Sequence, residues 1–203
     1  ARQDRKDKPR VPISAKLIAN LIQAAGVDRI MTMDLHADQI QGFFDIPVDH
    51  LKSQAIFFSH LQNNIDLDNV TFASPDVGGV KRARAYAKHF QRPLVICDKY
   101  RKRANEIAEM TVIGDVSGAD VVLVDDLVDT AGTLCRAASI IMEKGATSVR
   151  ALCTHPVLSG KAYENIENSV LKELLVCDTI PLTQKSDRIK VLSTAKLFAR
   201  AIR

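Results

Sequence analysis

Two adjacent carboxylates open the segment with the strongest chemical signal. Asp125 and Asp126 follow the apolar run 121–124, whose mostly β-branched residues are typical of a strand buried on both faces. Hydroxyls and small side chains come next, and apolar residues then take up helical spacing. The start of a helix attracts phosphate, and carboxylates accept hydrogen bonds from sugar hydroxyls. We therefore expect a site for a phosphorylated sugar, formed by Asp125, Asp126, Asp129, Thr130, Ala131, Gly132 and Thr133.

The same residues would also suit an ordinary strand-to-helix turn in which Asp129 or Thr130 caps the helix. The complete string at 125–133 is more specific than its parts. It resembles the phosphoribosyl pyrophosphate motif of the type I phosphoribosyltransferase fold, in which two acids precede a five-residue phosphate loop.

Two further acidic positions follow predicted strands and suit a divalent cation. Asp34 and His36 would share one side of the chain if the strand at 28–34 continues, and Asp76 stands beside a glycine pair. They could hold a metal ion, which for Asp76 would be magnesium if a nucleotide binds nearby. Equally, Asp34 could cap the next helix with His36 half-buried, and Asp76 could be a turn acid.

A basic segment follows another predicted strand. The five residues 99–103 carry four positive charges, and Lys99, Arg101 and Arg103 would point the same way in an extended chain. A mobile cationic loop of this kind could close on a polyphosphate and stabilise the charge that develops in phosphoryl transfer. The alternative is a charged hairpin tip.

Composition favours a globular protein whose partners are small anions. The chain is 46% hydrophobic and 26% charged, with a mild net charge of +4. Much of the positive charge lies in two short runs, at 2–10 and 99–103, so we expect no nucleic-acid partner. The four cysteines are widely spaced, which predicts buried thiols and no zinc site.

The sequence has no run of eighteen apolar residues and no charged-then-apolar leader. We therefore expect no membrane span, no signal peptide and a cytoplasmic location.

Strand and helix patterns alternate along the chain, which predicts an α/β fold with a mostly parallel sheet covered by helices. Ligands of such sheets bind beyond the carboxyl ends of the strands, so the polar clusters could converge on one cleft. Neither a P-loop motif nor a dinucleotide-binding glycine motif is present. The expected strands are 28–34, 70–74, 93–98, 107–113, 120–124, 148–153 and 171–177, and the expected helices are 13–25, 35–44, 52–63, 80–90, 132–144, 161–168 and one within 191–203.

Four segments together resemble the ribose-phosphate diphosphokinases, a family also called phosphoribosyl pyrophosphate synthetases. They are ARQDRKD at 1–7, DLHADQIQGFFDIPVD at 34–49, SPDVGG at 74–79 and DDLVDTAGT at 125–133. The later segments THP at 154–156, SG at 159–160 and CDTIP at 177–181 also fit. The resemblance implies a type I phosphoribosyltransferase-like fold with two similar domains. The first, at 1–52, would be incomplete, and the second, at 53–203, would carry the ribose 5-phosphate loop.

The resemblance also implies an activity, which is transfer of the diphosphoryl group of ATP to the 1-hydroxyl of ribose 5-phosphate. Asp125 and Asp126 would serve the ribose hydroxyls, and residues 129–133 would bind the 5-phosphate. Lys99 and Arg101 would stabilise the migrating group.

The resemblance assigns the remaining candidates to ATP and its Mg²⁺ cofactor. His36 and Asp76 would position Mg-ATP with support from Asp34, and Arg2 and Gln3 would approach the nucleotide. A homo-oligomer, a hexamer in this family, is also implied.

Members of the family begin well before a segment like 1–7, and about the first third of their chain has no counterpart here. We therefore expect this chain to keep the ribose 5-phosphate site and to be weak or inactive as a synthetase. The competing interpretations are a non-catalytic regulatory relative of the synthetase and a salvage phosphoribosyltransferase. The second would not need residues 34–49.

Overall fold

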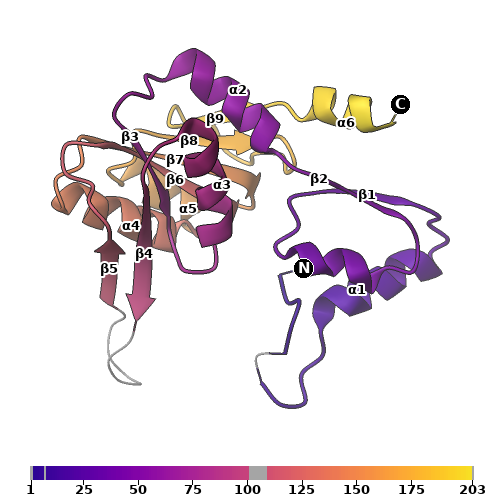
Figure 1. Cartoon of the computed structure of the whole chain (residues 1–203). Helices are drawn as coiled ribbons and strands as arrows, with labels where there is room; N and C mark the ends of the chain where they lie inside the picture. Colours follow the sequence, from indigo (N-terminus) through magenta and orange to yellow (C-terminus); the bar gives the residue numbers. More distant parts are fainter. Residues whose placement is uncertain (1, 7, 101–108, 203) are drawn as a thin grey trace. The chain divides into compact units, whose positions relative to one another are not determined.

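The computed structural model describes residues 2–6, 8–100 and 109–202 (Figure 1). The chain forms two compact units, one made of residues 1–53 with 197–203 and the other of residues 54–196. The elements of the first unit are α1 (Ser14–Ala24), β1 (Ile30–Met33), the 3-10 helix η1 (Asp38–Phe43) and β2 (Val48–Leu51). Helix α6 (Ala195–Ile202) ends the chain and begins within the second unit.

The first unit is small and its two strands are parallel neighbours. Its strand β1 ends at Met33, because Asp34 adopts a left-handed backbone with φ 40° that leaves the strand. Helix α1 buries only Ala15 and Ala19, whereas Leu17 and Leu21 are more than half exposed. Leu17 and Leu21, four residues apart, therefore form an apolar face of the helix that the described residues do not bury.

The second unit contains a seven-stranded sheet with the strand order β5-β4-β3-β6-β7-β8-β9. All neighbouring pairs are parallel except β4 and β5, which form an antiparallel hairpin. The strands are β3 (Val70–Ser74), β4 (Leu94–Tyr100), β5 (Glu109–Ile113), β6 (Asp120–Val128), β7 (Ser148–Pro156), β8 (Glu173–Cys177) and β9 (Ile189–Leu192), and the helices are α2 (Gln54–Asn64), α3 (Val80–Phe90), α4 (Gly132–Glu143) and α5 (Ala162–Glu167).

Helices cover both faces of this sheet, and alternate strand residues face opposite layers. In β6, Val121 and Leu123 belong to a core shared with α4 and α5, whereas Val122 and Val124 belong to a core shared with α2 and α3. Because both faces are covered, β3 is buried at every position. This explains why the central strands read as uninterrupted apolar runs.

The order of the strands reverses between β3 and β6. From β3 the chain passes through α3 to β4 on one side, yet β6 lies on the other side of β3. In open α/β sheets, a reversal of this kind is where the ligand-binding crevice lies, beyond the carboxyl ends of the two strands, because their following segments leave in opposite directions. The segments that meet there are the loop after β3 and the end of β6.

The predicted α/β class is confirmed, and β3 and α3 begin and end at the predicted residues. Several expectations were wrong in extent. β6 and β7 continue to 128 and 156, β4 continues to Tyr100 and so includes Lys99 of the basic segment, and the segment after β1 forms a 3-10 helix only over 38–43. Strands β2 and β9 were not predicted, because each has only four residues and includes charged or polar ones. Among the described residues, no helix is long and apolar enough to cross a membrane.

Gly79 allows α3 to begin close to β3. A Cβ atom at this position would lie 2.7 Å from Ser74 Oγ, which donates a hydrogen bond to the Asp76 carbonyl and is fully buried. We expect Gly79→Ala to lower the free energy of unfolding by about 1–3 kcal/mol, because the backbone or Ser74 must move.

Urea denaturation measures this change, with Gly42→Ala as the matched control. A Cβ atom at Gly42 would meet nothing within 4 Å. Equal effects of the two substitutions would contradict the close contact.

Candidate functional site

Strand β6 carries the acid pair past the end of its neighbour β3. Pairing of β3 with β6 ends at Ala73 and Leu123, whereas β7 continues beside β6 to Val128 and Pro156. Asp125 and Asp126 therefore lie inside the strand, and the expectation that they follow it was wrong. They nevertheless lie at the crevice, because no partner from β3 covers this part of β6.

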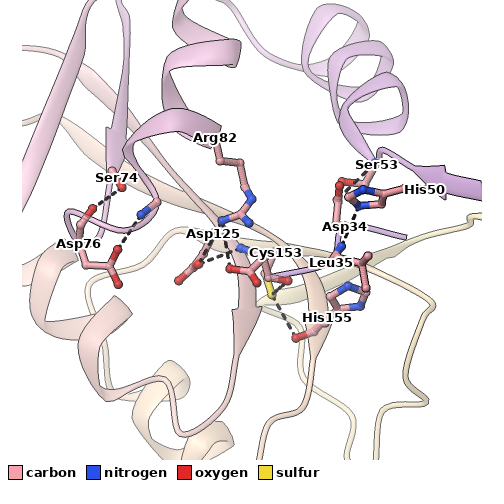
Figure 2. Close-up of polar contacts among 12 residues, drawn as sticks. Asp34, Leu35, His50, Ser53, Ser74, Asp76, Arg82, Asp125, Cys153 and His155 are labelled. Carbon is pink, nitrogen blue, oxygen red and sulfur yellow. Dashed lines mark hydrogen bonds and ion pairs between the residues drawn. The ribbon is translucent and has the colours of Figure 1, made fainter. Parts of the chain in front are cut away.

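Arg82, in the first turn of α3, neutralises part of this acidic charge. Its Nη1 lies 3.0 Å from Asp126 Oδ1 and 3.9 Å from Asp125 Oδ1. Figure 2 shows the guanidinium pointing from the helix toward the end of the sheet that carries Asp125. Asp126 is only 4% exposed, so a cation at this distance helps to offset the cost of burying its carboxylate.

Sequence reasoning missed Arg82. Arg82 is more than forty residues from the acids in sequence. The contact could not be predicted, because it depends on β3 and β6 being neighbours in the sheet. The available signal was its place three residues after Gly79, in the first turn of a helix that follows a predicted strand. A ligand at the crevice must pass close to a side chain in that position.

The two acids differ in their surroundings. Burial, followed by the neighbouring Asp126 carboxylate, raises the pKa of Asp125 to about 7. The Asp126 backbone N–H donates to Asp125 Oδ1 at 2.8 Å and favours the ionised form. Asp125 therefore changes its charge near neutral pH, and in its ionised form it can accept hydrogen bonds from ligand hydroxyls.

The predicted phosphate loop connects β6 to α4. Only Asp129, Thr130 and Ala131 separate the two elements, since β6 ends at Val128 and α4 begins at Gly132. Ala131 adopts a left-handed backbone with φ 62°, which costs an alanine about 1 kcal/mol. Its side chain is buried in the core next to α4, and this burial helps to hold the strained backbone in place.

Residues after β7 donate hydrogen bonds to the loop between β6 and α4. Ser159 donates its backbone N–H to the Asp129 carbonyl at 3.0 Å and its hydroxyl to Asp129 Oδ1. Asn165 of α5 donates its side-chain amide to the Thr130 carbonyl at 2.9 Å. Sequence reasoning placed Ser159 in a matching segment without a role, and it missed Asn165.

The loop after β3 holds Asp76 at the same crevice. Asp76 Oδ1 accepts the Gly79 N–H at 2.8 Å, which places the carboxylate at the start of α3 (Figure 2). The residue is exposed, so its carboxylate remains accessible to a ligand. The turn interaction that the sequence suggested is therefore present, and a cation role stays a prediction.

Asp34 and His36 lie in the first unit. The Ser53 N–H and hydroxyl both donate to Asp34 Oδ2, and Asp34 is buried, whereas His36 is exposed. Since β1 ends at Met33, the argument that both side chains share a strand face does not apply. Because Asp76 belongs to the second unit, a shared metal site stays a prediction.

The remaining predicted residues lie in separate parts of the chain. Gln3 fixes the start of α1, because its carbonyl accepts the Ala15 N–H at 3.1 Å and its side chain accepts the Ser14 hydroxyl. Arg2 is exposed beside it. The Lys99 backbone pairs with Met110 near the end of β4, and Arg101 lies outside the described residues.

Within the described residues, no group of three His, Cys, Asp or Glu side chains could hold a metal ion. Mg²⁺ usually binds through one or two carboxylates and takes its other ligands from water and substrate phosphates. The exposed carboxylate of Asp76 fits that kind of site. Buried Asp34, already bonded to Ser53, fits it poorly.

Comparison with known proteins identifies the family. Residues 81–203 match the model of the phosphoribosyl synthetase-associated domain, and residues 1–26 match the N-terminal domain of ribose phosphate pyrophosphokinase. The chain belongs to the ribose-phosphate pyrophosphokinase family. The resemblance found in the sequence is thereby confirmed.

Two curated ribose-phosphate pyrophosphokinases illustrate the similarity. Those of Porphyromonas gingivalis and Campylobacter jejuni are 57% and 58% identical over the whole chain, which spans 65% of the length of each. The crystal structure of phosphoribosylpyrophosphate synthetase from Mycobacterium smegmatis matches with a TM-score of 0.93 and 39% identity. That match covers 100% of this chain and 66% of the other.

Removal of the Arg82 cation tests its part in the site. We expect Arg82→Met to destabilise the protein by roughly 2 kcal/mol, because it removes the ion pair between Arg82 and the buried Asp126 carboxylate. Thermal or urea unfolding measures the loss. Arg84→Met, at an exposed position of the same helix, is the matched control, and a similar loss there would contradict the specific role of Arg82.

The raised pKa of Asp125 predicts a pH dependence of stability. Because the folded protein binds this proton more tightly than the unfolded chain, the stabilisation is greatest in acid and falls as the pH rises toward about 7. Asp125→Asn removes this dependence. Relative to wild type, the variant should gain up to about 1.4 kcal/mol per pH unit between pH 5 and 7.

Urea unfolding at several pH values measures this difference. Asp187→Asn, at an exposed position of the same unit, is the matched control. A difference between Asp125→Asn and wild type that does not change with pH, or the same change with pH for Asp187→Asn, would contradict the raised pKa of Asp125.

Proposed function

We propose that the protein is a ribose-phosphate pyrophosphokinase. It transfers the diphosphoryl group of ATP to the 1-hydroxyl of ribose 5-phosphate, giving phosphoribosyl pyrophosphate and AMP. The main support is the acid pair and the proposed phosphate loop. The acids lie near the end of β6, and the loop follows β6 directly, beyond the carboxyl end of β3. High identity to enzymes with that name over the whole chain supports the same reaction.

Ribose 5-phosphate suits the two halves of this site. Backbone N–H groups at the start of α4 and the hydroxyls of Thr130 and Thr133 can donate to the 5-phosphate. Asp125 and Asp126 repel phosphate but accept hydrogen bonds from ribose hydroxyls. The ligand is thereby oriented, with its phosphate at the loop and its hydroxyls at the acid pair.

Phosphoryl transfer depends mainly on positioning and on neutralising negative charge. Lys99 stands near the end of β4, two strands from the acid pair in the sheet. We assign Lys99 and Arg101 to the migrating diphosphoryl group, since both belong to the basic segment 99–103. Asp125 and Asp126 would hold the ribose hydroxyls in position. Because positioning and charge neutralisation supply most of the rate, neither acid is required as a strong base.

ATP would bring Mg²⁺, which neutralises its phosphates. Asp76 is the carboxylate best suited to contact it, with His36 and Asp34 as further candidates from the first unit. Arg2 and Gln3 are assigned to the nucleotide by their match to the family motif.

We also propose a homo-oligomer, a hexamer by family resemblance, in the cytoplasm, where ATP and ribose 5-phosphate are available. The half-exposed Leu17 and Leu21 of α1 support association, because a partner surface would remove them from water.

Binding experiments on this chain test the proposal. We expect calorimetry to detect ribose 5-phosphate binding, weakened at least tenfold by Thr133→Val or Asp126→Asn, because each removes a polar contact to the ligand. Lys99→Ala should leave this affinity nearly unchanged, since Lys99 is assigned to the diphosphoryl group.

The transfer itself is measured as release of AMP, in the full-length enzyme carrying the same substitutions. Lys99→Ala should abolish turnover there. A large loss of ribose 5-phosphate affinity in Lys99→Ala would assign Lys99 to substrate binding instead. Binding of phosphoribosyl pyrophosphate and a purine base, without ATP-dependent AMP release, would contradict the proposed function.

A further inference from the structure

All three carbonyl groups of the loop between β6 and α4 accept hydrogen bonds from the surrounding protein. The donors are the Ser159 N–H to the Asp129 oxygen at 3.0 Å, the Asn165 side-chain amide to the Thr130 oxygen at 2.9 Å and the Cys135 N–H to the Ala131 oxygen at 2.9 Å. Asn165 is the one side chain in this set. Its nitrogen must face the loop, because a carbonyl oxygen can only accept.

These contacts fix the direction of the loop N–H groups. The described residues contain no cis peptide bond, and in a trans peptide the N–H points opposite to the preceding carbonyl. The N–H groups of Thr130, Ala131 and Gly132 therefore point away from Ser159, Asn165 and Cys135. A phosphate bound at the start of α4 requires N–H groups that point toward it.

Backbone strain at Ala131 favours rotation of the peptide between Thr130 and Ala131. Rotating it by half a turn would bring φ of Ala131 from 62° to about −118° while its ψ stays near 0°, close to the conformation that most residues adopt at the third position of a type I turn. The same rotation would point the Thr130 carbonyl into the phosphate position and remove the Ala131 N–H from it. Strain at Ala131 thus favours a state that repels phosphate.

We propose that Asn165 is a positioning residue that holds the Thr130–Ala131 peptide in the phosphate-binding orientation. This inference rests on the proposed function, in which the loop binds the 5-phosphate. Rotation of the peptide would break the hydrogen bond from Asn165, and that loss opposes the relief of strain.

Helix α5 is a firm support for this contact. Ala162, Tyr163 and Ile166 are buried in the core shared with α4. The Tyr163 hydroxyl accepts the N–H groups of Thr183 and Gln184 at 3.1 and 3.3 Å. Asn165 therefore projects from a helix that is packed on one side and hydrogen-bonded to a second segment.

The test compares Asn165→Leu with Asn168→Leu, which makes the same change at an exposed position at the end of the same helix. Inorganic phosphate and ribose 5-phosphate are the probes, and calorimetry gives both dissociation constants. We expect Asn165→Leu to weaken both ligands roughly five- to tenfold, as loss of one hydrogen bond would. Asn168→Leu should stay within twofold of wild type.

A second substitution separates peptide orientation from a general structural effect. In an Ala131→Gly background the left-handed backbone carries no strain, so Asn165→Leu should weaken phosphate binding less than twofold. An equal loss in both backgrounds would overturn the inference. If Asn165→Leu fails to fold, Asn165→Gln, which keeps the amide on a longer stem, is compared in the same two backgrounds and should weaken phosphate only in the Ala131 one.

Backbone ¹³C chemical shifts of Ala131 give a readout that needs no ligand. They should indicate a left-handed residue in wild type and a residue with negative φ in a substantial population of Asn165→Leu. A left-handed Ala131 in both proteins would overturn the inference. The expected shift change, with no phosphate binding to wild type, would leave the peptide orientation supported and contradict the proposed function.

Discussion

The contact between Arg82 and the acid pair is the interaction on which the rest of the site depends. Two adjacent carboxylates on a strand that is largely buried would repel one another and destabilise the fold. Arg82 approaches both, and it can do so because Gly79 lets α3 begin directly above β3. The ion pairing of the two acids therefore depends on the close packing of α3 against β3.

The reversal of strand order explains why this contact is possible. Arg82 follows β3, the acids lie on β6, and these strands are neighbours although most of α3, β4 and β5 separates them along the chain. β6 also extends beyond β3, so on the β3 side the acids are flanked by the start of α3 and not by another strand. A ligand can then reach Asp125 without disrupting the sheet.

The sequence was most informative where the candidate site residues are contiguous. Residues 125–133 could be proposed as an acid pair and a phosphate loop because strand, loop and helix start follow one another directly. Arg82 and Asn165 could not, since their contacts depend on which elements are neighbours in the fold. The true length of β6 was also hidden, because pairing with β7 keeps Asp125 and Asp126 in the strand although their side chains are polar.

Ala131 combines a buried side chain with a strained, left-handed backbone. Glycine would adopt φ 62° at no steric cost, but it would contribute no side chain to the core beside α4. Alanine buries its methyl group and restricts the unfolded chain more than glycine does, while its left-handed backbone requires outside support. Ser159 and Asn165 supply that support from the segment after β7, on the opposite side of the loop from the N–H groups. Strand β7, which pairs with β6 beside the acids, therefore leads into the residues that hold this loop. In the proposed enzyme, the phosphate end and the hydroxyl end of ribose 5-phosphate would be held by neighbouring parts of one sheet.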